Sequence, residues 1–190
     1  MMISAILLAA GQSKRMNGEN KLIKKIQGIP LIKLSVKNIL ASSIDELIIV
    51  LGHQKEIIEK LIDKNEKIKF VFNKNFENGM ASSIKVGLNN LSEKTEAFFI
   101  CLGDMPMVNK NIYNLLIKSR SNKEIIVPTY NGQQCNPILF SKSMKKQIMT
   151  IEGDVGAKKI LQLNKNKILD IKTNDLSIMK NYNSQNDFSL

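Results

Sequence analysis

A loop of small and basic residues follows the first apolar segment of the chain. It reads Leu8-Ala-Ala-Gly-Gln-Ser-Lys-Arg15 and continues to Lys21. Because Ala9–Gly11 has almost no side chains, its backbone can approach a ligand closely, and amides in such a turn can bind phosphate oxygens. Arg15 and Lys21 add a planar and a point-like cation. The spacing matches neither GxxxxGK[ST] nor GxGxxG, so a basic surface loop is the alternative.

A carboxylate follows a second strongly apolar segment. Gly103-Asp104-Met105-Pro106 comes directly after Ala97–Leu102, which we expect to be a buried strand. Asp104 would then lie at the carboxyl edge of a sheet, where it can hold Mg²⁺ together with phosphate oxygens. The alternative is that Asp104 is a turn residue or caps a helix beginning near Asn109.

Short β-branched apolar runs alternate with amphipathic segments along most of the chain. This alternation predicts an α/β fold of three αβα layers, Rossmann-like, with a mainly parallel sheet. We find no internal repeat, linker or boundary, so residues 1–190 are expected to form a single domain. The expected strands are Ile3–Ala10, Glu46–Leu51, Ile68–Phe72, Ala97–Leu102 and Glu124–Pro128, and the expected helices are Leu31–Ala41, Gln54–Asp63, Met80–Leu91 and Asn109–Ser119.

The pattern loosens after Pro128. Asn131-Gly132 indicates a turn. Beyond it we expect a short strand at Pro137–Phe140, helices at Ser141–Thr150 and Gly156–Leu163, and a strand at Lys167–Ile171.

Ligands of open parallel sheets bind outside the carboxyl ends of the strands. Three unusual segments fall at such ends, namely Ala9–Lys21, Asn73–Ser83 and Gly103–Met107. Their coincidence favours a phosphate and metal site over a bland surface loop.

The composition narrows the class of partner. A net charge of +11 favours an anionic ligand, but the lysines are spread along the chain and aromatic residues make up only 5%. Nucleic-acid binding is therefore disfavoured. Phosphorylated small molecules would also be attracted by the positive charge. No apolar run is long enough to span a membrane, and the first residues lack the features of a signal peptide, so we expect a cytoplasmic protein.

The cysteines and the single histidine offer no obvious metal site. Cys101 lies in an apolar run and is expected to be a core residue, whereas Cys135 lies in a polar segment. With only His53 available, a histidine-based metal site is excluded by number, and we expect His53 to be structural or exposed.

LAAGQSKRM, with Lys21 downstream, resembles the signature of the MobA-like nucleotidyltransferases, and within them of the molybdenum cofactor cytidylyltransferases. The similarity continues, in order, through Gly28–Leu31, Asn73 with Gly79–Ser83, Gly103–Pro106, Asn131–Phe140 and Gly153–Ala157. It covers nearly the whole chain and implies a GT-A-like nucleotidyltransferase fold.

The resemblance also implies roles for individual residues. Arg15, Lys21 and Asp104 would be catalytic, with Mg²⁺ held by Asp104 and Asn183. Relatives that use CTP carry Ala-Ala-Gly in the loop, as here, whereas those that read guanine usually carry Ala-Gly-Gly. The expected nucleotide-binding set is Leu8, Ala9, Ala10, Gly11, Ser13, Arg15, Lys21, Asn73, Gly79, Ser83 and Asp104, and the expected acceptor side is Asn136, Pro137, Asp154 and Lys158.

The chain departs from the family pattern at three places. Cys135-Asn136-Pro137 stands where these cytidylyltransferases have Gly-His-Pro, and Lys158 stands where they have arginine. Asn183 replaces the aspartate of the second metal position, which leaves a neutral but acceptable ligand. The last helix of the family is expected to be short or absent.

The expected activity is Mg²⁺-dependent transfer of CMP from CTP to a molybdopterin-type phosphorylated acceptor, with release of pyrophosphate. A molybdoenzyme or its chaperone would receive the product. The alternatives are guanylyl or other nucleotidyl transfer, a sugar or polyol phosphate as acceptor, and a non-catalytic relative that only binds the cofactor.

Overall fold

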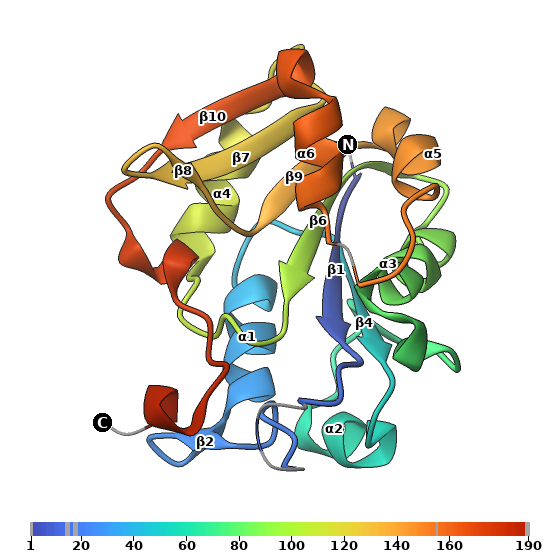
Figure 1. Ribbon diagram of the computed structural model, residues 1–190, viewed down its shortest axis with the longest axis vertical. Coiled ribbons are helices and arrows are strands. Elements are labelled where there is room, and N and C mark those ends of the chain that lie inside the picture. The colour runs from blue at the N-terminus through green and yellow to red at the C-terminus, as the bar shows by residue number, and fades with distance from the viewer. Residues whose placement is uncertain (1, 14–15, 17–18, 155, 189–190) are drawn as a thin grey trace.

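The computed structural model describes residues 2–13, 16, 19–154 and 156–188, apart from the side chains of Lys158 and Gln185. In this part of the chain an eight-stranded sheet has the order β10-β7-β9-β6-β1-β4-β5, with β8 paired to β7 (Figure 1). The strands are β1 Met2–Ala9, β4 Glu46–Leu51, β5 Ile68–Phe72, β6 Thr95–Leu102, β7 Ile125–Tyr130, β8 Gln133–Gln134, β9 Ile138–Ser141 and β10 Ile168–Lys172. A separate hairpin joins β2 (Lys25–Ile26) to β3 (Ile29–Pro30).

The sheet is mainly parallel, as the sequence predicts. β1 lies at its centre and pairs in parallel with β4 and β6, while β4 pairs in parallel with β5 and β7 with β10. Only the short β8 and β9 run antiparallel to their neighbours in the described sheet. The carboxyl ends of β1, β4, β5 and β6 therefore meet at one edge, which is the arrangement that gathers the three unusual segments.

Both faces of the sheet are buried. In β1, Ala5 and Leu7 pack into one core and Ile6 into the other, and β4 and β6 alternate in the same way. Helices cover both faces, which explains why the central strands are continuously apolar. The first core is covered by α1 (Leu31–Leu40), α2 (Lys55–Leu61) and α4 (Lys110–Lys118), and the second by α3 (Met80–Asn89), α5 (Lys145–Ile148) and α6 (Lys158–Leu163).

The segment after β9 differs from the expectation of a helix over Ser141–Thr150. Ser141 pairs with Ala97 as the last residue of β9, so the helix cannot begin there. A 3₁₀ turn at Lys142–Met144 follows, and α5 itself has four residues. The hydrogen-bond ladder of the neighbouring strand thus overrides the local helical pattern.

The C-terminal segment leaves β10, passes α4 and ends beside the β2–β3 hairpin (Figure 1). Its last described element is a 3₁₀ helix, Gln185–Phe188, whose Phe188 ring lies 5.7 Å from the Lys24 ammonium. The segment therefore crosses the carboxyl edge of the sheet. No helix in the described residues is long and apolar enough to cross a lipid bilayer.

Candidate active site

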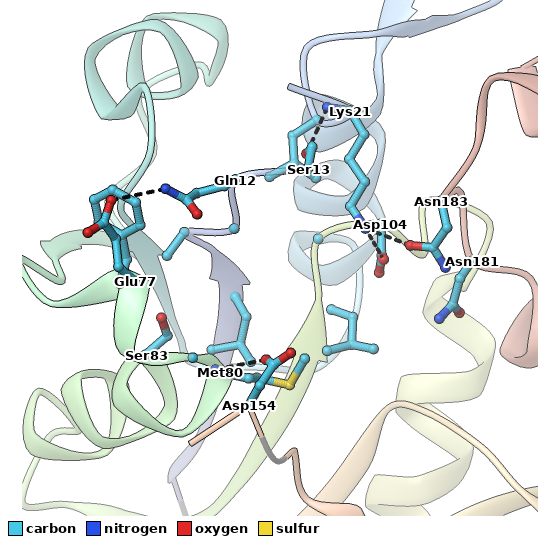
Figure 2. A pocket seen from close by; sticks show the side chains of 18 of the residues that line it. Gln12, Ser13, Lys21, Glu77, Met80, Ser83, Asp104, Asp154, Asn181 and Asn183 are labelled. Carbon is cyan, nitrogen blue, oxygen red and sulfur yellow. Dashed lines mark hydrogen bonds and ion pairs between the residues drawn. The ribbon is translucent and has the colours of Figure 1, made fainter. Parts of the chain in front are cut away.

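A cavity of about 730 Å³ opens at the carboxyl ends of β1 and β6, next to the N-terminus of α3 (Figure 2). This volume lies within the range of small-molecule binding sites, roughly 300–1,000 Å³. All three segments singled out in the sequence contribute to it. The described lining consists of Leu8, Ala10, Gly11, Gln12, Ser13, Lys21, Leu22, Phe76, Glu77, Asn78, Gly79, Met80, Ser83, Leu102, Gly103, Asp104, Asp154, Asn181 and Asn183.

The loop after β1 is held at both of its ends. The Lys21 backbone N–H donates to Ser13 Oγ at 3.1 Å, which joins the two sides of the loop. Met16, between them, is fully buried, and its N–H donates to the Ser13 carbonyl at 2.8 Å. The backbone at Lys21 is therefore fixed although its side chain is long and flexible. Arg15 lies outside the described residues.

Asp104 is positioned by a close approach between β6 and β1. The Gly103 N–H donates to the Leu8 carbonyl at 3.1 Å, and a Cβ at Gly103 would lie only 2.8 Å from that oxygen. Ser35 Oγ donates to the Gly103 carbonyl at 3.0 Å from the side of α1. The cap of α4 is Asn109, whose side chain accepts from Asn111 N, so Asp104 does not cap that helix.

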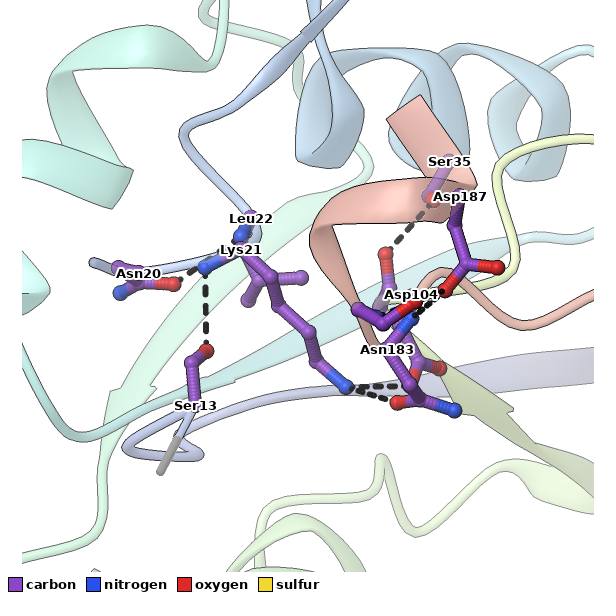
Figure 3. Close-up of polar contacts among 10 residues, drawn as sticks. Ser13, Asn20, Lys21, Leu22, Ser35, Asp104, Asn183 and Asp187 are labelled. Atoms are coloured by element: carbon purple, nitrogen blue, oxygen red, sulfur yellow. Dashed lines mark hydrogen bonds and ion pairs between the residues drawn. The ribbon is translucent and has the colours of Figure 1, made fainter. Parts of the chain in front are cut away.

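Lys21, Asp104 and Asn183 form what we call the charged cluster. Lys21 Nζ lies 2.6 Å from Asp104 Oδ2 and 2.7 Å from Asn183 Oδ1, so the two oxygens converge on one ammonium (Figure 3). The side chains of Lys21 and Asp104 are only 20% and 13% exposed. Such a partly desolvated ion pair is stronger than a surface pair, because water screens it less.

The C-terminal segment holds Asn183 in place through its neighbours. Tyr182 is fully buried, and its N–H donates to the Asp104 carbonyl at 2.9 Å. Asp187 Oδ2 accepts from the N–H groups of Asn183 and Ser184 at 2.8 and 2.7 Å, and from the Ser184 hydroxyl at 2.9 Å. The donors on Ser184 and Asn183 lower the pKa of the Asp187 carboxyl below its ordinary value, because they stabilise its charged form.

The opposite end of the cavity, which we call the neutral end, is built from the start of α3. The Asn73 side-chain amide donates to Ser82 Oγ at 2.8 Å and to Ser83 Oγ at 3.0 Å. The Ser82 hydroxyl is within donating distance of the Gly79 carbonyl inside the turn, at 2.8 Å. Ser83 instead lines the cavity, and because Asn73 donates to it, its own proton can serve an acceptor atom on a ligand.

Two backbone segments cross closely beside the neutral end, at the first turn of α3. Gly79 has φ +93°, and a Cβ there would lie 2.6 Å from the backbone of Gly153 and Asp154. Ala81 N–H donates to the Gly153 carbonyl at 3.1 Å, and Met80 N–H to Asp154 Oδ1 at 3.3 Å (Figure 2). Asp154 thus reaches the cavity by capping the first turn of α3.

The described lining is richer in negative than in positive groups. Glu77, Asp104 and Asp154 contribute carboxylates, against Lys21 as the single cation among the described lining residues. Glu77 accepts from the Gln12 side chain at 3.1 Å across the mouth of the cavity. A polyanionic ligand would therefore be repelled by these carboxylates unless additional cations accompany it.

One further observation indicates that the charged cluster can hold a divalent cation. Asp104 Oδ1 is buried and has no hydrogen-bond partner within the described part of the chain. A buried carboxylate oxygen without a partner is costly, and coordination of a cation would satisfy it. Asp104 and Asn183 each direct an oxygen at the same point, which the positively charged Lys21 ammonium occupies.

The structure brings most of the expected nucleotide-binding residues together. Ala9 and Asn73 are buried behind the cavity rather than in its described lining, and Asn136 and Pro137 are also absent from that lining, as part of a cis peptide that leads into β9. Arg15 and the Lys158 side chain fall outside the described residues. The expected residues that do line the cavity are Leu8, Ala10, Gly11, Ser13, Lys21, Gly79, Ser83, Asp104, Asp154 and Asn183.

Several lining residues were not expected from the sequence. Gln12 and Glu77 lie within segments that the sequence analysis singled out, but nothing in their types marked them. Asn181 is two residues from Asn183 and could have been found by that proximity. Asp187 does not line the cavity but holds the backbone of Asn183, and it could have been found from Ser184-Gln-Asn-Asp187, since the spacing [ST]-x-x-[DE] is typical of a side chain that accepts from nearby backbone amides.

The chain is similar in sequence to known nucleotidyltransferases. A family model described as "MobA-like NTP transferase domain" matches residues 5–169. A probable molybdenum cofactor guanylyltransferase of Methanosarcina mazei is 30% identical over 151 residues, which span 76% of this chain and 66% of that protein. The molybdenum cofactor cytidylyltransferase of Escherichia coli K12 is 29% identical over 140 residues, which span 74% and 70%.

Solved structures agree in fold. Rv0371c of Mycobacterium tuberculosis H37Rv superposes with a TM-score of 0.87 at 20% identity, covering 100% of this chain and 96% of that one. A second structure of Rv0371c, described as a complex with manganese, gives a TM-score of 0.81 at 18% identity and covers 100% and 97%. Since the family model matches most of the residues that build the sheet and the cavity, the chain belongs to the MobA-like NTP transferase family.

Proposed function

We propose that the protein is a Mg²⁺-dependent nucleotidyltransferase that moves CMP from CTP to a molybdopterin-type phosphorylated acceptor and releases pyrophosphate. The observation that carries the proposal is the charged cluster, in which Lys21, Asp104 and Asn183 converge at one end of a cavity of about 730 Å³. Family membership and the names of the relatives support the class of reaction.

In the proposed reaction a phosphate oxygen of the acceptor attacks the α-phosphorus of CTP. The new P–O bond forms as the bond between the α-phosphorus and the bridging oxygen to the β-phosphate breaks, and that electron pair leaves with pyrophosphate. A phosphate monoester is largely ionised at neutral pH, because its second pKa is near ~6. The attacking group therefore needs no strong base, and catalysis depends on positioning and charge neutralisation.

The charged cluster would act on the phosphates. Lys21 would bind the triphosphate, Arg15 would add a second cation beside it, and Asp104 with Asn183 would hold Mg²⁺. When bound there, the ion would neutralise charge on the phosphates during transfer. The carboxylates of Glu77, Asp104 and Asp154 support this requirement, since a triphosphate alone would meet repulsion in this cavity.

The neutral end would bind the nucleoside. Ser83 can donate a hydrogen bond to a base acceptor, and cytosine offers a carbonyl oxygen and a ring nitrogen. Ala10 lines the cavity although it is only 3% exposed, and its methyl group faces Gly52, where a Cβ would lie 2.7 Å away. The methyl therefore fits only because residue 52 is glycine. The choice of cytosine over guanine rests on the resemblance, since Ala-Ala-Gly at Ala9–Gly11 is typical of relatives that use CTP.

The acceptor would approach from the side of Asp154, where the segment Gly153–Asp154 forms a rim of the cavity. Lys158 follows on the same segment and would provide a cation for the acceptor phosphate. Asn136 and Pro137 do not line the cavity, so a role for them requires an acceptor that extends beyond it. A molybdoenzyme or its chaperone would take up the product.

Thermal unfolding with CTP, GTP, UTP and ATP, each with Mg²⁺, tests the choice of base. A ligand at about 100 times its Kd stabilises by about 2.7 kcal/mol. In a protein of this size that corresponds to a rise in Tm of roughly 5–10 °C. We expect the largest shift with CTP, and pyrophosphate release from CTP only when the acceptor is added. A larger shift with another nucleotide would contradict the choice of CTP.

Guanylyl transfer is the second candidate. It is favoured by the 30% identity to the probable guanylyltransferase of Methanosarcina mazei, which is as high as the identity to the cytidylyltransferase. In that case GTP would give the largest shift in Tm and would support pyrophosphate release with the same acceptor. The same set of measurements therefore separates the two candidates.

A further inference from the structure

The Lys21 ammonium occupies the place that a divalent cation would take. Its Nζ is 2.6 Å from Asp104 Oδ2 and 2.7 Å from Asn183 Oδ1, so it stands where the two side chains that we assign to the metal converge, while Asp104 Oδ1 has no partner among the described residues. An ammonium and a divalent ion cannot share such a site, because two cations a few ångströms apart repel strongly in a partly buried environment. One must leave when the other arrives.

The charge of the cluster favours the ammonium when no ligand is bound. Lys21 carries one positive charge and Asp104 one negative charge, while Asn183 is neutral. The charges of these three groups therefore balance, and the cluster itself has no net negative charge to attract a metal; Glu77 and Asp154 line other parts of the cavity. A carboxylate at position 183 would change this balance, because a net negative charge would remain beside the ammonium.

Lys21 can move without disturbing the loop that carries it. Its backbone N–H is fixed to Ser13 Oγ at 3.1 Å, whereas its side chain has four carbons that rotate. Ser13 and Gly11 belong to the same loop and line the cavity, where triphosphate oxygens would lie against them. An anion bound there offers the ammonium a new partner within reach of its fixed backbone.

We propose that Lys21 is an internal counter-ion that blocks the metal position until a triphosphate draws it away. This inference rests on the proposed function for the nature of the anion. Metal and triphosphate then bind cooperatively, each raising the affinity of the other by the same factor. Without the triphosphate the metal binds weakly, and Asp104 keeps its ion pair with Lys21 through Oδ2.

Mn²⁺ binding, measured by electron paramagnetic resonance on the purified chain without nucleotide, tests the proposal independently of activity. Lys21→Met should bind Mn²⁺ at least tenfold more tightly than the wild-type protein, because the competing cation is gone. Lys33→Met is the matched control, since Lys33 pairs with Asp63 at 2.9 Å on the surface and should leave Mn²⁺ binding unchanged. Equal or weaker Mn²⁺ binding in Lys21→Met would overturn the proposal.

Asn183→Asp provides a second variant that keeps Lys21. The added carboxylate leaves a net negative charge in the cluster, so Mn²⁺ affinity should rise at least tenfold without nucleotide. An unchanged affinity in this variant would also overturn the proposal.

Inorganic tripolyphosphate, used as a probe without a base, tests the coupling. It should strengthen Mn²⁺ binding at least tenfold more in the wild-type protein than in Lys21→Met, after correction for the Mn²⁺ that it binds in solution. Equal strengthening in both proteins would contradict the exchange. Because no base or acceptor is involved, the proposal of CTP as substrate can fail while this result stands, and the reverse also holds.

Discussion

At one end of the cavity Lys21, Asp104 and Asn183 meet from segments up to 162 positions apart in the sequence, whereas the neutral end is built from Asn73, Ser82 and Ser83, which lie within ten positions. The first end depends on the whole fold, because β1, β6 and the C-terminal segment must all be in place. The second end depends mainly on local contacts between the end of β5 and the first turn of α3, with one close approach from Gly153–Asp154. The charged cluster thus provides electrostatics, and the neutral end provides shape and hydrogen bonding.

Because the two ends differ, substitutions at each end are expected to impair different steps of the reaction. Changes at the charged cluster should lower the rate of transfer, since charge develops on the phosphates in the transition state. Changes at the neutral end should weaken binding of the nucleotide with little effect on the rate at saturation, since its contacts are the same before and during transfer.

Asp104→Asn should cause the largest loss. It keeps the size of the side chain but removes its charge, and kcat should fall by roughly 10²–10³, as for other groups aimed at developing charge. Steady-state pyrophosphate release at saturating CTP and Mg²⁺ measures this. Asp63→Asn is the control, since Asp63 pairs with Lys33 on the surface, and it should retain full activity. A kcat for Asp104→Asn within twofold of the wild-type value would remove Asp104 from the metal site.

Asn183→Ala should have an intermediate effect. It removes one of the two oxygens that face Lys21 Nζ, and hydrogen bonds to charged groups contribute about 1.5–3 kcal/mol, so kcat should fall at least about tenfold. Asn181→Ala is the matched control, because Asn181 also lines the cavity and makes no hydrogen bond to Lys21. Equal losses in the two variants would show that the C-terminal segment acts only by covering the cavity.

Ser83→Ala should have a smaller effect, and this effect should be limited to binding of the nucleotide. The loss of one neutral hydrogen bond, about 1 kcal/mol, should raise KM for CTP about fivefold and leave kcat nearly unchanged. Ser82→Ala is matched closely, since Ser82 also accepts from Asn73 but does not line the cavity. The comparison between cluster and neutral end would fail if Ser83→Ala lowered kcat as strongly as Asn183→Ala.

Treatment with a thiol reagent is expected to have the smallest effect on activity, because Cys101 is buried in the core at β6, the strand that precedes Asp104. Burial raises the pKa of the Cys101 thiol to about 12, with Tyr113 opposing this slightly through a hydrogen bond. A raised pKa keeps the thiol neutral, so at pH 8 it should not react with Ellman's reagent in the folded protein. In a Cys135→Ser variant one thiol per chain should become reactive only in denaturant, with activity unchanged by the reagent. Rapid labelling of the folded variant would show that water reaches this core.

The central strands could be predicted because burial on both faces leaves a continuous apolar run. β4 and β5 match their expected bounds, and β1 and β6 differ by one or two residues at their ends. Ser141 shows the limit of this approach, since its strand conformation depends on pairing with Ala97, which is 44 positions away. Local patterns cannot report such pairing.

Some residues of the site could likewise be predicted from local sequence, whereas others depend on long-range contacts. Ser83 and Gly79 could be placed from a local motif, and Asp104 from the strand before it. The contact of Lys21 with both Asp104 and Asn183 could not be predicted, because it depends on the path of the C-terminal segment and on the burial of Tyr182. Residues Asn136 and Pro137 were assigned by resemblance, and they do not reach the cavity.

Transfer of label from CTP tests the central claim most directly. With CTP labelled at the α-phosphate, the molybdopterin-type acceptor and Mg²⁺, we expect the label to appear in the acceptor product, one pyrophosphate being released for each label transferred. Asp104→Asn should slow this transfer by roughly 10²–10³. Label that stays in CTP, or that appears in free CMP or CDP without entering the acceptor, would contradict nucleotidyl transfer to this acceptor.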